Sequence, residues 1–129
     1  SKTVKKILAT GKSLIDARVL VMGATFKEDV SDIRNSKVVD VINEIKSFSC
    51  RVDVVDPHAD SEELHREYGF ELTTATNAPY DAVIVAVNHK EYLHLDEKYF
   101  DSILSDKGVL IDIKGIYKDI DFDLDYWTL

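Results

Sequence analysis

Residues 82–87 read AVIVAV, an unbroken apolar run long enough for one buried strand. Three further runs share this character: RVLVMG at 18–23, RVDVVD at 51–56 and VLIDI at 109–113. Runs rich in valine and isoleucine are typical of strands in a parallel sheet, because helices cover both faces of such a sheet. The sequence therefore predicts four parallel strands.

Amphipathic stretches between these runs predict the helices that cross the sheet. Apolar positions of the first stretch recur at helical spacing: Val38, Val39, Ile42, Ile45 and Phe48. The preceding pair Asn35-Ser36 is of a capping type, which predicts where this helix begins. Further helices are predicted over Glu62–Tyr68 and Asp96–Leu104, with a short strand or its remnant at Phe70–Leu72.

The alternation of strand and helix predicts one α/β domain, a Rossmann-like, doubly wound parallel sheet in three layers with right-handed crossovers. Residues 17–129 would form this domain. Residues 1–16 are expected to be the end of a connecting helix, because Val4, Ile7 and Leu8 share one face of Thr3–Leu8. With 129 residues, 45% of them hydrophobic, the chain suits a single core and leaves no room for a second domain.

The composition argues against several classes of protein. A formal net charge of −8 makes nucleic acid and anionic membranes poor partners. No apolar run approaches the roughly 20 residues that span a bilayer, and no signal peptide is evident, so we expect a soluble cytoplasmic protein. The single cysteine, Cys50, cannot form an internal disulfide, and no metal-binding spacing is evident.

A long loop follows the first predicted strand, at the sheet edge where parallel sheets bind ligands. This segment, ATFKEDVSDIRN at 24–35, has no G-x-G-x-x-G fingerprint and instead carries Phe26, Lys27 and Arg34. A lysine and an arginine can hold a phosphate or carboxylate in place of backbone amides. Alternatively, the two cations pair with the acidic residues of the same loop: Glu28, Asp29 and Asp32.

The last predicted strand is followed by another cation, Lys114. A parallel sheet brings the ends of its strands to one edge, so Lys27 and Lys114 can share a ligand there, although a lone lysine is usually just solvated. Asp112, inside the strand run, is either a carboxylate that orients this loop or an ordinary polar residue at a strand end.

Other polar residues at the predicted strand ends carry weaker signals. Asp56-Pro57 favours a turn that ends its strand over a contact with a ribose. His89 has no nucleophile or paired carboxylate beside it in the sequence and is interpreted as a loop histidine. Cys50 precedes a buried strand without an activating partner, which favours a small core residue over a nucleophile.

Two strings, GATFKEDVSDIRNSKVVDVI from Gly23 and VDVVDPHAD from Val52, resemble the C-terminal domain of the UDP-glucose and GDP-mannose dehydrogenase family. The pattern is G-x-x-F-K, an acidic residue, D-x-R-x-S, a helix, and a strand ending in D-P. It continues through AVIVAVNHKEY to LIDIKGIY and so covers essentially the whole chain. The F-K-E, D-I-R-N and D-x-K-G variants resemble members that oxidise UDP-N-acetylhexosamines, such as UDP-N-acetyl-D-mannosamine and galactosamine dehydrogenases.

The resemblance implies a part of an enzyme that oxidises the sugar C6 alcohol to a carboxylate in two NAD-dependent steps, through a thiohemiacetal on a cysteine. Phe26 and Lys27 match residues that contact the UDP-sugar. Lys114 stands where many members have a substrate-binding arginine, often acting across a subunit boundary. Arg34 matches an arginine that reaches the NAD held by another domain.

The family's NAD-binding domain and catalytic cysteine have no counterpart in this sequence, and Cys50 does not occupy that cysteine's place. No catalytic residue is therefore predicted here, and the isolated chain is expected to be inactive. The partners that the resemblance implies are a UDP-sugar, NAD and the rest of a homo-oligomeric parent dehydrogenase.

Two other classes of protein compete with this interpretation. A signalling receiver domain would use Asp56 and Lys114, but it needs an acidic pair after the first strand, where Gly23-Ala24-Thr25 stands. An oligomerising module is favoured if the aromatic tail Tyr126-Trp127 is exposed on the domain and buried against another subunit.

Overall fold

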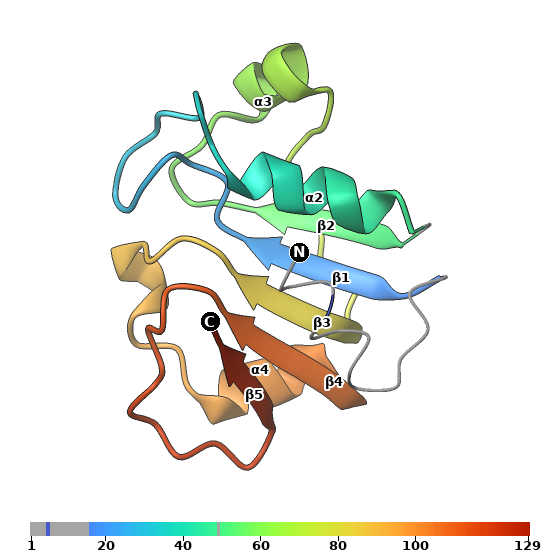
Figure 1. Cartoon of the computed structure of the whole chain (residues 1–129), viewed down its shortest axis with the longest axis vertical. Helices are drawn as coiled ribbons and strands as arrows, with labels where there is room; N and C mark the ends of the chain where they lie inside the picture. The colour runs from blue at the N-terminus through green and yellow to red at the C-terminus, as the bar shows by residue number, and fades with distance from the viewer. Residues whose placement is uncertain (1–4, 6–15, 49) are drawn as a thin grey trace.

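The computed structural model of the chain describes residues 5, 16–48 and 50–129. Within these residues the strands form one parallel sheet in the order β2-β1-β3-β4-β5 (Figure 1). Their bounds are β1 Arg18–Met22, β2 Arg51–Val55, β3 Tyr80–Val85, β4 Leu104–Asp112 and β5 Asp125–Thr128. The chain order reverses between β1 and β3, and such a switch point leaves a crevice at the carboxyl ends of the strands.

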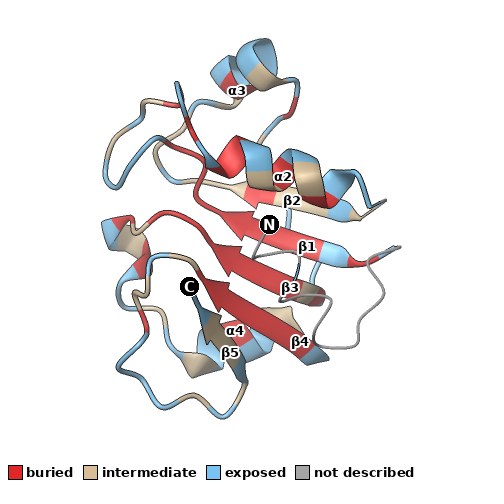
Figure 2. Cartoon of the chain, viewed as in Figure 1, coloured by how far each residue is buried: buried red, intermediate tan, exposed pale blue. Residues whose placement is uncertain are grey.

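Helices cover both faces of the sheet, as the predicted three-layer α/β class requires. The helical segments are α2 Val38–Lys46, α3 Ser61–Tyr68, the 3-10 turn η1 Lys90–Tyr92, and α4 Glu97–Ile103. Buried residues of α2 and α3 pack with Val19 and Val21 of β1 on one face, and Phe100 of α4 packs with Leu20 and Met22 on the other. Figure 2 shows β1, β3 and most of β4 as the buried centre of these layers.

The fifth strand was not among the four predicted strands. Tyr126 and Trp127 lie in β5, which pairs with β4, and both side chains pack against the core from half-buried positions. The aromatic tail, taken as exposed in the oligomerising alternative, is therefore half-buried within this chain. The four residues of β5, one acidic and two aromatic among them, gave no signal of a buried strand, because the two end residues are exposed and the two central ones are only half-buried.

The predicted short strand at Phe70–Leu72 is absent, although the segment runs beside β2. The amide of the next residue, Thr73, donates to the carbonyl of Val54 at 2.8 Å, and its hydroxyl accepts from the Val54 amide. One residue making both bonds is too little for a ladder. The segment matches the remnant that was the alternative expectation.

Helices α2, α3 and α4 do not all begin in the same way. Asp60 and Asp96 cap α3 and α4, each accepting hydrogen bonds from amides of the first turn. The predicted capping role of Asn35-Ser36 at α2 is wrong: the N-cap is Lys37, which makes no side-chain cap bond, and Asn35 has a φ of 58°. The first amides of α2 are thus left without a capping side chain.

The predicted helix end at Thr3–Leu8, and with it the boundary at residue 16, lies outside the described residues. Among the residues that are described, no helix has both the length and the apolar character to cross a bilayer.

Candidate functional site

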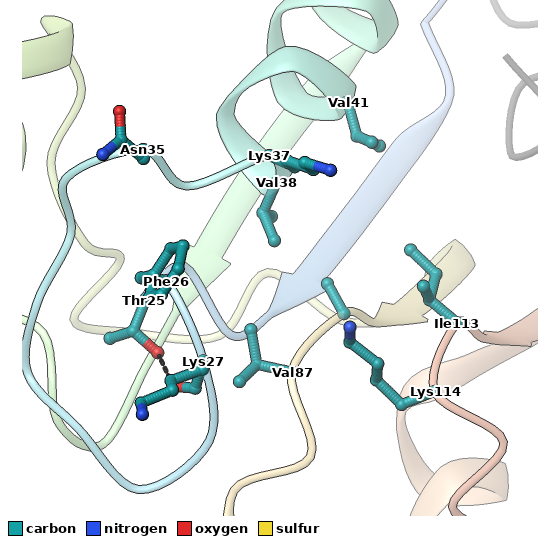
Figure 3. A pocket seen from close by; sticks show the side chains of 11 residues that line it. Thr25, Phe26, Lys27, Asn35, Lys37, Val38, Val41, Val87, Ile113 and Lys114 are labelled. Atoms are coloured by element: carbon teal, nitrogen blue, oxygen red, sulfur yellow. Dashed lines mark hydrogen bonds between the residues drawn. The ribbon is translucent and has the colours of Figure 1, made fainter.

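A pocket of about 360 Å³ opens at the carboxyl ends of the strands, beside the switch point between β1 and β3 (Figure 3). Loops after β1, β3 and β4 and the start of α2 contribute to its wall: Thr25, Phe26, Lys27, Asn35, Lys37, Val38, Val41, Ala86, Val87, Ile113 and Lys114. We call it the lysine pocket. Its base is apolar and its cations stand at the rim, an arrangement suited to an organic anion.

Three lysines from three separate segments line the lysine pocket. Lys27 comes from the loop after β1, Lys37 from the N-cap of α2, and Lys114 from the turn after β4. Figure 3 shows Lys114 extending into the space between Ile113 and Val87, whereas the ammonium group of Lys27 points away from it. In a chain with a net charge of −8, this is a local positive site within a negative molecule.

The start of α2 adds partial positive charge to the same wall. No side chain caps this helix, and although the Val39 amide donates to the Ser36 carbonyl, the helix dipole favours an anion at this end. Phe26 stands nearby with 54% of its surface exposed, the second most exposed large apolar side chain among the described residues. An exposed ring beside cations suits a ligand with both a flat and an anionic part.

Gly23 allows the walls of the lysine pocket to approach each other closely. Its φ is +102°, and a Cβ placed on it would lie 2.7 Å from the Cβ of Val87. Both the backbone conformation and the space at this position therefore require glycine. The absence of a side chain lets the segments after β1 and β3 meet.

His89 is buried at 0% exposure and joins the loop after β1 to the ends of two strands. Its Nε2 lies 2.9 Å from Oδ2 of Asp56 and 3.2 Å from the Thr25 hydroxyl, and its Nδ1 accepts from the Asp29 amide at 3.0 Å. His89 is thus a loop histidine, as interpreted, but a buried one with a paired carboxylate that no sequence signal indicated. No sequence motif indicated it, because its partners lie 33 to 64 positions away.

The Asp56 carboxylate is the second component of this buried cluster, which we call the His89 cluster (Thr25, Asp29, Asp56 and His89). Oδ2 of Asp56 accepts from the Ala24 amide at 2.7 Å, and Oδ1 accepts from the amides of His58 and Ala59. Burial alone would raise the Asp56 pKa, but the hydrogen bonds outweigh it and hold that pKa below its ordinary value. The predicted strand-ending turn is confirmed, and a carboxylate so occupied is a poor phosphoacceptor for a receiver domain.

Ligand atoms of Asp29, His58 and His89 lie within 4.8 Å of one another, a spacing that metal sites also show. Both ring nitrogens of His89, however, are already hydrogen-bonded, and Nε2 of His58 pairs with Glu91 at 2.9 Å. A metal ligand must offer a free lone pair, which His89 does not. We therefore treat this group as a structural hydrogen-bond cluster.

The turn that carries Lys114 is built on Asp112. This fully buried carboxylate accepts hydrogen bonds from the amides of Ile116 and Tyr117 and from the hydroxyl of Tyr126 at 2.6 Å. Of the two open interpretations, the loop-orienting one is confirmed. The bond to Asp112 and burial both raise the pKa of the Tyr126 hydroxyl, with burial the larger cause.

Arg34 lies outside the residues that line the lysine pocket. Its guanidinium contacts the Asp32 carboxylate at 3.1 and 3.2 Å, as the alternative of an ion pair within the loop predicted. The hydrogen bond from Arg34 holds the pKa of the Asp32 carboxyl below its ordinary value. With 80% of its side chain exposed, Arg34 remains open to a partner from beyond this chain, so its predicted role toward NAD stays a prediction.

Cys50 packs against the core cluster under α2 from a half-buried position. Burial raises the pKa of its thiol, which lowers the fraction of reactive thiolate at neutral pH. This agrees with the interpretation of Cys50 as a small core residue rather than a nucleophile.

The model of the UDP-glucose/GDP-mannose dehydrogenase family, UDP binding domain, matches residues 20–119. This match covers most of the chain. The chain belongs to this family.

Relatives within the dehydrogenase family agree with that assignment. The chain is 38% identical over 114 residues to a UDP-N-acetyl-D-glucosamine 6-dehydrogenase of Salmonella typhi and 36% identical over 125 residues to one of Pseudomonas aeruginosa. These matches cover 88% and 96% of this chain but only 27% and 30% of those proteins. The chain thus spans less than a third of the relatives' length.

Solved structures show the same fold. The UDP-N-acetyl-mannosamine dehydrogenase from Staphylococcus aureus matches with a TM-score of 0.73 and 25% identity, over 98% of this chain and 28% of that one. The UDP-D-ManNAc dehydrogenase from Pyrococcus horikoshii matches with a TM-score of 0.76 at 17% identity, which supports the fold alone. Its coverage is 98% of this chain and 28% of that one.

The sequence predicted that Phe26, Lys27 and Lys114 lie at one edge of the sheet, and in the structure all three line the lysine pocket. Their roles in binding stay predictions. The prediction did not include Lys37, which follows Ser36 in the string D-I-R-N-S-K. The signal was available, because the first residue of a helix at the ligand edge faces the ligand crevice.

Proposed function

We propose that the lysine pocket holds the nucleotide-sugar of an NAD-dependent UDP-sugar 6-dehydrogenase, with this chain as the C-terminal substrate-binding domain. The substrate class is a UDP-N-acetylhexosamine, or else UDP-glucose, oxidised to its uronic acid. The presence of Lys27, Lys37 and Lys114 in the wall of one pocket carries the proposal.

The chemistry of the lysine pocket suits a diphosphate attached to rings. The diphosphate of a UDP-sugar carries about two negative charges, which the three ammonium groups and the uncapped start of α2 can neutralise. The exposed ring of Phe26 offers a flat apolar surface to the uracil or the sugar. The apolar base formed by Val38, Val87 and Ile113 excludes water from one side.

The NAD would be bound mainly by another part of the parent enzyme, where it accepts the hydride. This chain has no glycine-rich dinucleotide loop, so its own contribution is limited to an edge contact. We propose Arg34 for that contact, because its guanidinium is exposed and lies outside the lysine pocket. The chain then provides one wall of a cleft between domains and assembles with the remainder of a homo-oligomeric enzyme.

Calorimetric titration of the chain with UDP tests the substrate site directly. We expect binding that weakens about tenfold for each of Lys27→Ala, Lys37→Ala and Lys114→Ala, because each removes one charge-assisted contact. Lys107→Ala is the matched control, since Lys107 is exposed at the other end of β4. UMP should bind more weakly than UDP if the diphosphate is the anchored group.

Two outcomes would count against the proposal. One is an affinity for UDP that all three pocket variants and Lys107→Ala leave equally unchanged. The other is the absence of any binding by the folded wild-type chain at millimolar UDP, which would move the substrate site to other parts of the enzyme.

A further inference from the structure

The hydrogen bonds around His89 determine which ring nitrogen carries the proton. Nδ1 faces the amide of Asp29, which is a donor, so Nδ1 must be the unprotonated acceptor. The proton therefore resides on Nε2, which faces two oxygens, Oδ2 of Asp56 and the hydroxyl of Thr25. This network fits the neutral imidazole with hydrogen on Nε2.

The Thr25 hydroxyl links His89 to the backbone of a residue that lines the lysine pocket. It donates to the backbone carbonyl of Lys27 at 2.8 Å, which leaves its oxygen free to accept from His89. The carbonyl bound in this way belongs to Lys27, which lines the lysine pocket next to Phe26. One chain of bonds thus runs from a buried ring to the Phe26-Lys27 backbone.

Asp29 fixes the loop from its other side. Its amide donates to His89, its carboxylate accepts from the amide of Lys90 at 2.8 Å, and its φ of 59° is a conformation that aspartate tolerates only at some cost. The loop between Thr25 and Asp29 is therefore held at both ends by the segment that follows β3. The exposed Lys27 and Glu28 lie in the span between these two attachments.

We infer that His89 is a positioning residue for the substrate site: it touches no ligand, but its two nitrogens hold the loop that presents Phe26 and Lys27. This inference rests on the proposed UDP site for its consequence in binding. His89 has no exposed surface, does not line the lysine pocket, and makes all these contacts to backbone or buried side chains. Its effect is therefore indirect, through the geometry of the loop.

Two conservative variants separate the two nitrogens. His89→Asn keeps an acceptor close to the place of Nδ1, and His89→Gln keeps a donor close to the place of Nε2. Amide hydrogen exchange of Asp29 and Ala24, measured by NMR, reports the loop. UDP titration reports the site, and thermal unfolding shows that each variant is folded. Nitrogen-15 spectra of the His89 ring in the wild type report the tautomer.

We expect His89→Ala to lose about tenfold in UDP affinity and to lose protection of the Asp29 amide. His89→Asn should keep the Asp29 protection, and His89→Gln should recover most of the affinity, because it restores the link through Asp56 and Thr25. A purely structural role would lower the unfolding temperature of all three variants, and the protection of Asp29 and the UDP affinity would then fall together in each of them.

Three results would overturn the inference: a tautomer with the proton on Nδ1, unchanged exchange at Asp29 in His89→Ala, or equal UDP affinity in all folded variants. If the wild type binds no UDP while the exchange pattern follows the expectation, the substrate proposal fails and the anchoring of the loop by His89 stands.

Discussion

Two segments at the same sheet edge each present a lysine to the pocket, and they are anchored in opposite ways. The β1–α2 loop, residues 24–36, is held by Asp56 and His89, which come from the ends of two other strands. The turn after β4, residues 113–117, is held by Asp112, the last residue of its own strand. A short turn can be organised locally, whereas a long loop needs side chains from elsewhere in the fold.

The consequence for function is that the two lysines differ in what supports them. Lys114 follows two positions after its anchor, so its placement is set by β4 itself. Lys27 depends on the folding together of β1, β2 and β3, whose ends meet at the His89 cluster. Substitutions at positions distant in sequence from the pocket should therefore displace Lys27 more than Lys114.

Asp56→Ala should produce the largest loss of stability. It leaves the amides of Ala24, His58 and Ala59 without their acceptor, and it leaves Nε2 of His89 only the more distant Thr25 hydroxyl. Several unsatisfied donors should lower the free energy of unfolding by about 4 kcal/mol, measured by urea denaturation.

Asp112→Ala leaves three donors without an acceptor and should lower the free energy of unfolding less than Asp56→Ala does. Asp121→Ala, at an exposed position, should hardly change it. An equal effect of the two buried substitutions would break the contrast between distant and local anchoring.

Gly23→Ala should produce the next largest loss in the free energy of unfolding, and Gly115→Ala is its comparison. Both glycines have positive φ, but a Cβ on Gly23 would lie 2.7 Å from that of Val87, whereas the nearest atom at Gly115 is 3.4 Å away. We expect about 3 kcal/mol for Gly23→Ala, from strain plus overpacking, and about 1 kcal/mol for Gly115→Ala, from strain alone. Similar unfolding midpoints for the two variants would contradict the crowding at Gly23.

The same contrast explains what the sequence could predict. Strands with continuous valine and isoleucine were evident, and so was the loop-orienting alternative for Asp112, because its partners lie within five positions along the chain, apart from Tyr126. The role of His89 was not evident, because pairing it with Asp29 and Asp56 requires the strand order. β5 was missed because its four residues, Asp125–Thr128, are exposed or half-buried and form no continuous apolar run.

Tyr126→Phe sharpens the comparison at the second anchor. It removes one donor to Asp112 and leaves the ring in the core, so the free energy of unfolding should fall by about 1 kcal/mol. The two backbone bonds to Asp112 remain, and we expect the Lys114 turn to keep its place. UDP affinity should therefore equal that of the wild type. A loss as large as that of Lys114→Ala would mean that β5 holds the turn more than Asp112 does.

Arg34→Ala should have the smallest effect in this chain, although Arg34 lies in the same loop as Lys27. Its exposed pair with Asp32 is screened by water, so neither thermal unfolding nor UDP titration should change measurably. In the intact dehydrogenase the proposed contact with NAD predicts a raised KM for NAD and an unchanged KM for the UDP-sugar. Arg34 lies outside the lysine pocket, so the KM for the UDP-sugar should stay the same. If only that KM changed, the guanidinium would contact the substrate and not NAD. The split between the two KM values therefore decides whether this loop serves one ligand or two.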